Sequence, residues 1–360
     1  MEDGKMKTFK KFIALMLTGM LITALTACGG SKTTEAPATA DTPAAEAPAA
    51  SAPAETKEDK DLIYVGFVQV GAESDWRMAN TKSMQETFTE ENGFKFEMVD
   101  AQQKTDKQIT AIRDFIQKDV DYIVLAPNTE AGWDTVLGEA RDAGIPVIIV
   151  DRMIQTSDDS LFTAWVGSNF KQEGYDAVDA LAEALKLKGI DPKAEEINIV
   201  TLQGTMGSSA QIGRTDGFAE KMKEYPNWKM LDRQSGDFTQ EKGQEVMESF
   251  LKSYPDIDVV IAENDNMAFG AINAIKAAGK TCGPNGDITI VSFDAVKAAF
   301  EAMIAGDIDV DVECNPLHGP RVKEIIEKLE AGQTVDKIAY VKEDVFFAKD
   351  AANIIGSRQY

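Results

Sequence analysis

Residues 106–126, which read DKQITAIRDFIQKDVDYIVLA, show a helical pattern followed at once by a buried strand. The first part, 106–118, carries apolar residues at i, i+3, i+6 and i+7, so they share one helical face. These residues are Ile109, Ile112, Phe115 and Ile116. The second part, 122–126, is a short, continuous apolar run, typical of a strand that is covered on both faces. A helix that leads into such a strand predicts a parallel sheet flanked by helices.

The same alternation of apolar runs and amphipathic stretches continues along the chain. The first series of predicted strands covers 62–70, 94–101, 122–126, 146–151 and 165–168. The second series covers 197–203, 229–234, 259–262, 288–293 and 308–313. Further helical patterns lie at 245–251 and 268–278. The order β-α-β-α-β-α-β therefore occurs over 62–151 and again over 197–294. It predicts an α/β protein with two doubly wound parallel-sheet domains of like topology.

The C-terminal part adds elements that have no sheet of their own. A helix is predicted at about 321–331 and a late strand at 337–347. We expect these elements to cross back toward the first domain, which would join the two domains through several strands.

The N-terminus has the features of a secretory signal. Basic residues precede an apolar run over 12–25, which is too short to span a membrane. The run ends in Leu25-Thr26-Ala27-Cys28, which resembles the bacterial lipobox, where the thiol is acylated and the signal is cut before it. Residues 29–60 lack large apolar side chains and predict a disordered tether. We therefore expect a lipoprotein signal peptide at 1–27 and a lipidated Cys28 that opens a tether over 28–60. An ordinary signal that contains a cysteine is the alternative.

Composition excludes several classes of function. The formal net charge is −23, which disfavours nucleic acid and anionic membrane surfaces as partners. His318 is the only histidine, so zinc sites, histidine-based triads and haem ligation lack their usual residues. We expect no metal and no cofactor, and we interpret His318 as a loop or helix-start residue. Cys282 and Cys314 could form a disulfide or remain as two free thiols.

Polar side chains gather where the predicted strands end, and ligands of open α/β sheets bind at that edge. Residues 73–77 follow the first strand, and Asp151-Arg152 follows the fourth. In the second domain, Arg214 lies on the helix after the first strand, and later strands end at polar residues. The predicted ligand-binding residues are Glu73, Ser74, Asp75, Trp76, Arg77, Asp151, Arg152, Arg214, Asn264 and Asp294.

This mixture of side chains suits a sugar. Carboxylates accept hydrogen bonds from hydroxyls, the arginine fork donates to two neighbouring hydroxyls, and an indole covers the apolar face of a ring. Taken singly, each residue also fits a helix cap or a surface pair, and Asp294 could be an N-cap. The loop 204–209 looks like a phosphate loop but lacks the Gly-Lys-Ser/Thr ending, so we interpret it as a plain turn. Trp133 is interpreted as packing at a helix start.

Several sequence strings carry a family resemblance. They are VGFVQVG at 65–71, ESDWR at 73–77, QQK at 102–104, LQGT at 202–205 and QSGDFT at 234–239. Through them the chain resembles the type I periplasmic sugar-binding proteins of ABC importers, the ribose- and galactose-binding group. The similarity covers about 62–347 and is greatest to the galactofuranose-binding branch. Asp151-Arg152, Asn264-Asp265 and Phe293-Asp294 mark the wider superfamily only.

The resemblance implies a role for each part of the site. The 73–77 loop would contact the ring and supply the stacking Trp76, and Asp151 and Arg152 would grip the ligand. Arg214 would reach across the cleft, and Asn264 and Asp294 would form a polar pair. The hinge strand near 312–315 would add a contact, which the spacing does not assign to Glu313 or Asn315. The branch commonly has Gly where this chain has Asp75, so the identity of the sugar stays open.

The resemblance also implies an architecture. It predicts the type I periplasmic binding protein fold with a three-stranded hinge near Ser168, Cys314 and Lys342. The N-terminal lobe would comprise 61–167 plus 315–342. The C-terminal lobe would comprise 168–314 plus 343–360.

The implied function is that of a non-enzymatic, lipid-anchored extracytoplasmic protein. It would capture a monosaccharide in an interdomain cleft and deliver it to the membrane permease of an ABC importer. We expect a monomer that touches the membrane only through its lipid. A sugar or signal binder that serves a chemoreceptor is an alternative within the binding class. A glycosidase is another, although arginines should keep the carboxylates ionised and poor as proton donors. A transcription repressor would need a DNA-binding segment where the secretory signal stands.

Overall fold

The computed structural model describes residues 62–360. The predicted signal peptide at 1–27, the lipidation of Cys28 and the tether at 28–60 lie outside the described residues and stay predictions. Within 62–360, no helix has both the length and the apolar character needed to cross a membrane.

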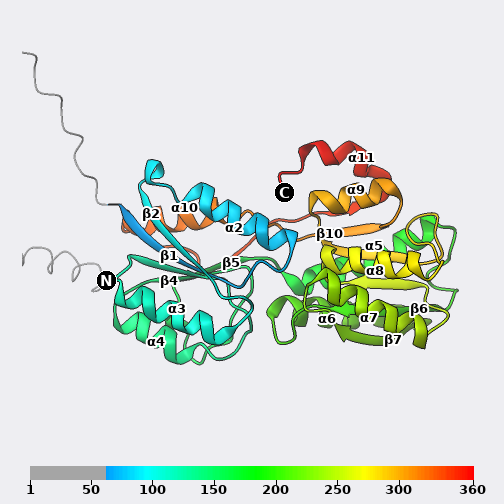
Figure 1. The fold of residues 1–360 in the computed structure, drawn as a ribbon, viewed down its shortest axis with the longest axis horizontal. Helices are drawn as coiled ribbons and strands as arrows, with labels where there is room; N and C mark the ends of the chain where they lie inside the picture. The colour runs from blue at the N-terminus through cyan, green and yellow to red at the C-terminus, as the bar shows by residue number, and fades with distance from the viewer. Residues whose placement is uncertain (1–61) are drawn as a thin grey trace, which may run out of the picture. The chain divides into compact units, whose positions relative to one another are not determined.

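The first lobe is built on a parallel sheet with the strand order β11-β5-β4-β3-β1-β2. Its strands are β1 (Ile63–Gln69), β2 (Phe94–Asp100), β3 (Tyr122–Leu125), β4 (Val147–Val150), β5 (Ala164–Gly167) and β11 (Ile338–Tyr340). Its helices are α2 (Asp75–Thr87), α3 (Thr105–Gln117), α4 (Asp134–Asp142) and α10 (Gly319–Glu330). Helices α3 and α4 cover one face, and α2 and α10 cover the other (Figure 1). The apolar face of α3 predicted from the sequence is buried at Ile112 and Phe115.

The second lobe repeats this plan with the strand order β12-β10-β9-β8-β6-β7. Its strands are β6 (Ile197–Gln203), β7 (Trp228–Ser235), β8 (Val259–Ala262), β9 (Thr289–Asp294), β10 (Val310–Glu313) and β12 (Val345–Phe347). Its helices are α5 (Phe170–Leu187), α6 (Ser209–Lys221), α7 (Gln240–Ser253), α8 (Asp265–Ala277), α9 (Lys297–Ala305) and α11 (Ala348–Ile354). Helices α5 and α6 pack on one face, and α7, α8, α9 and α11 pack on the other. The predicted fold class is therefore confirmed.

The chain passes between the two sheets three times. It crosses from β5 to α5, from β10 to α10, and from β11 to β12. The single late strand predicted over 337–347 is wrong, because this stretch forms two short strands that pair in different sheets. β11 lies parallel to β5, whereas β12 lies antiparallel to β10. The apolar residues of the stretch are interrupted by the charged residues 342–344, and these lie in the segment between β11 and β12 that forms no strand. The lobe boundaries themselves stay a prediction.

Three residues left open by the sequence are now placed. Cys282 and Cys314 are both buried and free, so they do not form a disulfide. His318 is buried just before α10, beside the Trp76 ring. Trp133 is buried at the start of α4, where its indole N–H donates to the Thr129 carbonyl at 2.8 Å, and it packs in the core of the first lobe.

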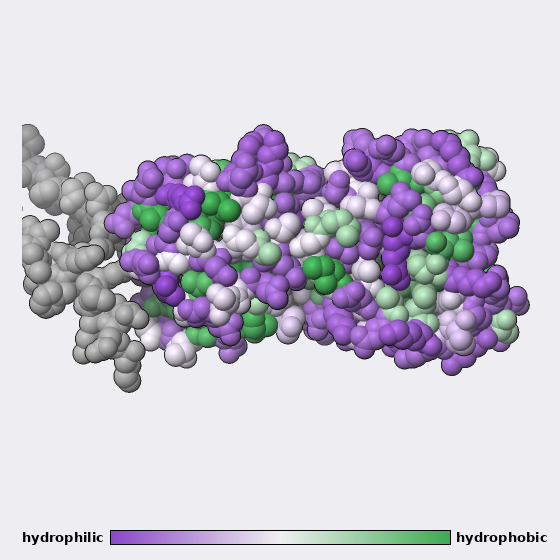
Figure 2. All heavy atoms as spheres, turned by 90° about the horizontal axis from the view of Figure 1, so that it is seen from below, coloured by the Kyte–Doolittle hydropathy of each residue, from purple (hydrophilic) through white to green (hydrophobic). Residues whose placement is uncertain are grey.

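The surface is mostly hydrophilic on the face drawn in Figure 2, and apolar residues appear there in separate patches. Among the described residues the large exposed apolar side chains are scattered over the chain. They are Met78, Leu187, Met206, Ile304, Ile338 and Tyr340.

Candidate functional site

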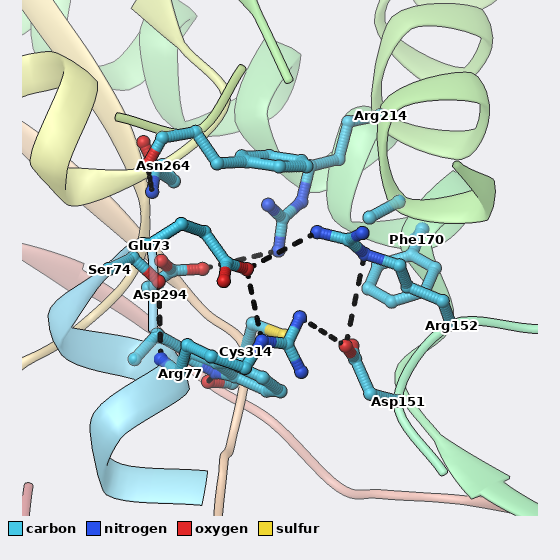
Figure 3. A pocket seen from close by; sticks show the side chains of 13 residues that line it. Glu73, Ser74, Arg77, Asp151, Arg152, Phe170, Arg214, Asn264, Asp294 and Cys314 are labelled. Carbon is cyan, nitrogen blue, oxygen red and sulfur yellow. Dashed lines mark hydrogen bonds and ion pairs between the residues drawn. The ribbon is translucent and has the colours of Figure 1, made fainter. Parts of the chain in front are cut away.

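A pocket lies at the carboxyl ends of strands from both sheets, where the sequence predicted the site. The space between its side chains amounts to about 280 Å³ and includes open solvent. Nine of the ten predicted residues line it: Glu73, Ser74, Trp76, Arg77, Asp151, Arg152, Arg214, Asn264 and Asp294. Four further residues complete the lining: Phe170, Ala210, Phe238 and Cys314. Figure 3 shows the charged side chains from the two lobes pointing toward one another.

Asp75 is the predicted residue that the structure does not bring into the pocket. It is the first residue of α2 and its side chain is exposed, because Ser74 before it is the N-cap and Trp76 after it turns inward. Its backbone N–H donates to Asn266 Oδ1 at 3.0 Å. Asp75 therefore lies beside the pocket rather than among its lining residues.

Strained backbone holds two carboxylates at the strand ends. Asp151 follows β4 with a φ of 63°, and Asp294 ends β9 with a φ of 112°. Positive φ values are uncommon for residues other than glycine, and such strain gathers at functional sites. The two residues lie at the carboxyl ends of the fourth strands of their respective series, so the two lobes present a carboxylate in a similar place.

Arg77 of the first lobe donates a hydrogen bond from each of its three side-chain nitrogens. Its Nε donates to Glu73 Oε1 at 3.0 Å, its Nη1 to Gln69 Oε1 at 3.3 Å, and its Nη2 to Asp151 Oδ2 at 2.8 Å. Burial alone would raise the pKa of Asp151, but Arg77 and Arg152 outweigh it and lower that pKa. Asp151 is therefore ionised, as the sequence predicted.

Arg214 plays a similar part in the second lobe. Its Nε donates to Glu173 Oε2 at 2.7 Å, its Nη1 to the Glu263 carbonyl, and its Nη2 to Asp294 Oδ1 at 3.4 Å. Burial raises the pKa of Asp294 well above its ordinary value, and Arg214 only partly opposes this. At Asp294, unlike at Asp151, desolvation therefore outweighs the arginine contact, which raises the pKa of this carboxyl although Arg214 lies 3.4 Å away.

Arg152 differs from the other two arginines, because most of its donors are free. Its Nη1 donates to the Asn128 carbonyl at 3.1 Å. Its Nη2 lies 3.7 Å from Glu73 Oε1 and its Nε lies 3.9 Å from Asp151 Oδ2, which is too far for hydrogen bonds. Burial and the neighbouring Arg77 lower the pKa of Arg152 to about 10. Arg152 thus offers the pocket N–H groups that no residue within 62–360 accepts.

Aromatic rings close the remaining sides of the pocket. Trp76 is buried, and its indole N–H donates to the Cys314 carbonyl at 2.6 Å, which fixes the ring. The Arg77 guanidinium lies 4.6 Å from the centre of that ring. The Phe238 ring lies 5.1 Å from the Arg152 guanidinium. Phe170, at the start of α5, adds a third aromatic side chain.

Sequence reasoning found Trp76 but missed the other apolar lining residues, Phe170, Ala210 and Phe238. Phe238 belongs to the QSGDFT string at 234–239, and in the structure its ring packs so closely on Gly204 that a Cβ there would lie 1.9 Å from it. The Gly204 N–H also donates to Glu263 Oε2 at 2.8 Å. The loop 204–209 therefore packs as a strand-to-helix turn under an aromatic residue. No sequence signal marked Glu173, whose partner Arg214 lies 41 residues away.

The hinge strand contributes one lining residue, Cys314. Its neighbours Glu313 and Asn315, between which the sequence did not decide, do not line the pocket. Glu313 pairs with Arg358 at 2.9 Å, and the Asn315 N–H donates to Glu343 Oε1 at 2.7 Å.

One group of side chains within 62–360 has a geometry that could hold a metal ion. Atoms of Glu173, Cys314 and Glu343 all lie within 4.8 Å of one another. Burial raises the pKa of the Cys314 thiol well above its ordinary value, and the Arg214 guanidinium already pairs with Glu173. A protonated thiol beside a fixed cation is a poor ligand set for a metal.

Comparisons with known proteins agree with this architecture. The family model for a periplasmic binding protein domain matches residues 65–317. The chain is 40% identical over 291 residues to the galactofuranose-binding protein YtfQ of Escherichia coli (strain K12), with 80% of this chain and 88% of that protein covered. A protein of Mycobacterium smegmatis solved in complex with β-D-fucofuranose is 42% identical, with a TM-score of 0.78 and coverage of 83% of this chain and 95% of that chain.

A further relative is the periplasmic binding protein of the arabinose ABC transporter from Shewanella sp. ANA-3, solved with α- and β-L-arabinofuranose. It is 40% identical, with a TM-score of 0.77 and coverage of 82% of this chain and 95% of that chain. The likeness thus extends over both lobes and all three crossings between the sheets. The chain therefore belongs to the periplasmic binding protein family and has the type I fold of that family.

Proposed function

We propose that this chain is an extracytoplasmic binding protein that captures a monosaccharide in its furanose form and delivers it to an ABC importer. The observation that carries the proposal is the pocket at facing strand ends, where buried arginines and carboxylates of two lobes surround a space bounded by aromatic rings. The relatives named above bind galactofuranose, fucofuranose or arabinofuranose, which supports a five-membered ring as the ligand.

The free hydrogen-bonding groups of the pocket match a sugar. Among residues 62–360, Arg152 has N–H donors that no group accepts, and Glu73 has one buried carboxylate oxygen, Oε2, without a partner. Asp294, whose pKa is raised, faces them from the second lobe. Each sugar hydroxyl both donates and accepts a hydrogen bond, so neighbouring hydroxyls can satisfy these groups together. Trp76 and Phe238 would cover the C–H faces of the ring.

The sugar would be bound and released without any covalent change. We propose that the charged groups hold a ligand rather than cleave it, because Arg77 and Arg152 lower the pKa of Asp151, which makes it a poor proton donor, and Glu73 is already paired with Arg77 at 3.0 Å. Incubation with nitrophenyl furanosides and pyranosides checks this point, since release of nitrophenol would instead support a glycosidase.

A thermal-shift screen tests the binding function. The panel is D-galactose, D-fucose, L-arabinose, D-ribose, D-fructose and xylitol, with sucrose as a control for general solute effects. A ligand present at 100 times its dissociation constant stabilises the folded state by about 2.7 kcal/mol. We expect a rise in unfolding temperature with sugars that populate a furanose ring, followed by saturable heat in calorimetric titration. A panel in which no sugar shifts unfolding contradicts the proposal.

The site of action is also a proposal. Cys28, if acylated, would hold the folded body at the outer face of a membrane through residues 29–60. In that position the two lobes could present the sugar to a membrane permease.

A further inference from the structure

Hydrogen bonds outside the pocket join the two lobes directly. Each runs from a backbone N–H of the first lobe to an acceptor of the second lobe. They are Met153 N–H to Ser209 Oγ at 2.7 Å, Asp75 N–H to Asn266 Oδ1 at 3.0 Å, and Glu130 N–H to the Gly207 carbonyl at 2.9 Å. Two of the acceptors are side chains, and we call Ser209 and Asn266 the latch residues.

The latch residues lie beside the pocket walls without belonging to them. Ser209 immediately precedes the lining residue Ala210, and Asn266 lies two residues after the lining residue Asn264. Their donors are placed in the same way, because Asp75 lies between two lining residues and Met153 follows Arg152. These bonds can therefore form only when the two walls of the pocket have come together.

Neither latch side chain caps a helix of its own lobe. Ser208 is the N-cap of α6 and Asn264 is the N-cap of α8, so neither latch residue caps its helix. Within residues 62–360, the Ser209 hydroxyl and the Asn266 amide oxygen are hydrogen-bonded only to the first lobe. Both residues are buried in this arrangement, with 8% and 9% of their surface exposed, so removing either acceptor takes a hydrogen bond from a shielded contact between the lobes.

We infer that Ser209 and Asn266 are positioning residues that set the balance between the open and closed forms. They thereby scale the affinity for every sugar by one common factor. The inference rests on the proposed function. A ligand that contacts both walls binds the closed form, so its apparent affinity depends on how readily that form is reached. Removing a latch bond lowers the stability of the closed form but leaves the pocket unchanged, so the preference among sugars should stay the same.

The test compares Ser209→Ala, Asn266→Ala and the double variant with the parent. Ser253→Ala and Asn273→Ala are matched controls, because both residues are exposed in helices of the same lobe. Calorimetric titration uses the two sugars among D-galactose, D-fucose and L-arabinose that bind the parent most tightly. Small-angle scattering gives the radius of gyration of each free protein.

We expect each single latch variant to weaken both sugars by the same factor, about two- to tenfold, and the double variant to show the product of the two factors. If the free parent is already mostly closed, the affinities change less and the radius of gyration of the free variants rises instead. The controls should match the parent in both measurements.

Two results overturn the inference. One is a double variant with the affinities and the free radius of gyration of the parent. The other is a change in the ratio of the two affinities, which would place Ser209 or Asn266 in ligand selection. If the parent binds none of the sugars, the proposed function fails, and the latch is judged on the free radius of gyration alone. A larger radius in the double variant then supports the latch, and an equal radius overturns it.

Discussion

Arg152 and Arg214 are both buried in the pocket, but they use their donors differently. Arg214 bonds Glu173, the Glu263 carbonyl and Asp294 of its own lobe, whereas Arg152 bonds one carbonyl, and no hydrogen-bond acceptor within 62–360 reaches its Nε or Nη2. The family resemblance implied that both arginines contact the ligand, Arg152 by gripping it and Arg214 by reaching across the cleft. The structure instead indicates that Arg152 is available to a ligand and that Arg214 mainly holds its wall in place.

This difference predicts different effects for the two lysine substitutions. Arg152→Lys should weaken sugar binding about ten- to a hundredfold with little effect on unfolding, because charge-assisted hydrogen bonds contribute about 1.5–3 kcal/mol and an ammonium lacks the planar fork. Arg214→Lys should weaken binding and also lower the free energy of unfolding by about 1–3 kcal/mol, since buried acceptors lose partners. Calorimetric titration and urea unfolding measure the two quantities.

The matched control for both substitutions is Arg113→Lys, whose guanidinium pairs with Glu139 on the surface of the first lobe. This control should bind and unfold like the parent. Parental affinity in Arg152→Lys would remove that residue from the ligand contacts.

At the scale of secondary-structure elements, helices α5 and α6 can pack closely because glycine, which has no side chain, stands at their contact. A Cβ at Gly217 of α6 would lie 2.2 Å from the Lys171 carbonyl oxygen and 3.2 Å from Gly174 Cα, both in α5. This close approach brings Glu173 of α5 within hydrogen-bonding reach of Arg214 on α6. The close packing of α6 on α5 thereby positions the part of the pocket wall that carries Arg214.

Gly217→Ala should therefore destabilise the fold by about 1–3 kcal/mol, because the added methyl group meets backbone that cannot yield cheaply. It should also weaken sugar binding, because α6 carries Arg214. Gly138→Ala is the control, since a Cβ at this position of α4 meets no atom within 4 Å. That control should gain up to about 1 kcal/mol from its better helix propensity. Urea unfolding of both variants is the measurement, and equal stability would contradict the packing argument.

The three crossings between the sheets meet at Glu343, which lies between β11 and β12. Its Oε1 accepts hydrogen bonds from the Ser168 hydroxyl at 2.6 Å and from the Asn315 N–H at 2.7 Å, and these residues lie on the other two crossings. Burial, and then the neighbouring Glu173, raise the pKa of Glu343 to about 8. In the folded protein the Glu343 carboxyl therefore keeps its proton at neutral pH. In the unfolded chain the same carboxyl loses its proton once the pH exceeds the ordinary pKa of a glutamate.

Stability should consequently fall as the pH rises from about 5 to 8. A carboxyl group whose folded pKa is raised stabilises the fold fully below the unfolded pKa, and this contribution is lost as the pH passes through the folded pKa. The raised pKa of Glu263, about 7, acts in the same direction and likewise arises from burial. Glu343→Gln removes one titrating group while keeping an acceptor, so its free energy of unfolding should depend less on pH than that of the parent.

The comparison is made by urea unfolding at pH 5, 6, 7 and 8, with the exposed Glu301→Gln as the control. An equal pH dependence in Glu343→Gln and in the parent would show that Glu343 is not the proton-holding group.

At the scale of the whole molecule, we expect the lobes to close on the sugar about the crossings near Ser168, Cys314 and Lys342. A ligand that contacts both lobes favours the closed form by its differential affinity. Small-angle scattering should therefore give a smaller radius of gyration at saturating sugar than in the free protein. Sucrose at the same concentration controls for contrast and solute effects. An unchanged radius at saturation, shown by calorimetry on the same sample, would contradict closure.

The anchor is also tested on the whole protein. Cys28→Ser should move the protein from the membrane fraction to the medium or the periplasmic fluid, because serine would not receive the two acyl chains that we expect on Cys28. Two acyl chains anchor a protein stably, whereas a single chain holds it only marginally. The sugar-induced thermal shift of the released protein should equal that of the parent. Retention of the variant in the membrane fraction would show that the lipid is not on Cys28.

The sequence by itself determined the architecture and the edge where the site lies. Buried strands such as 122–126 and amphipathic helices such as 106–118 are read from periodicity, which is a local property. In parallel sheets the carboxyl ends lie together, so nine predicted residues could be placed at one pocket from their positions in the chain.

Only the tertiary structure decided the contacts that depend on distant partners. It divided 337–347 between two sheets, left Asp75 outside the pocket and paired Arg214 with Glu173. It also showed that burial outweighs Arg214 at Asp294, which the sequence pattern could not reveal. These outcomes depend on desolvation and on which donors reach which acceptors after packing, and no local pattern of residues encodes either of them.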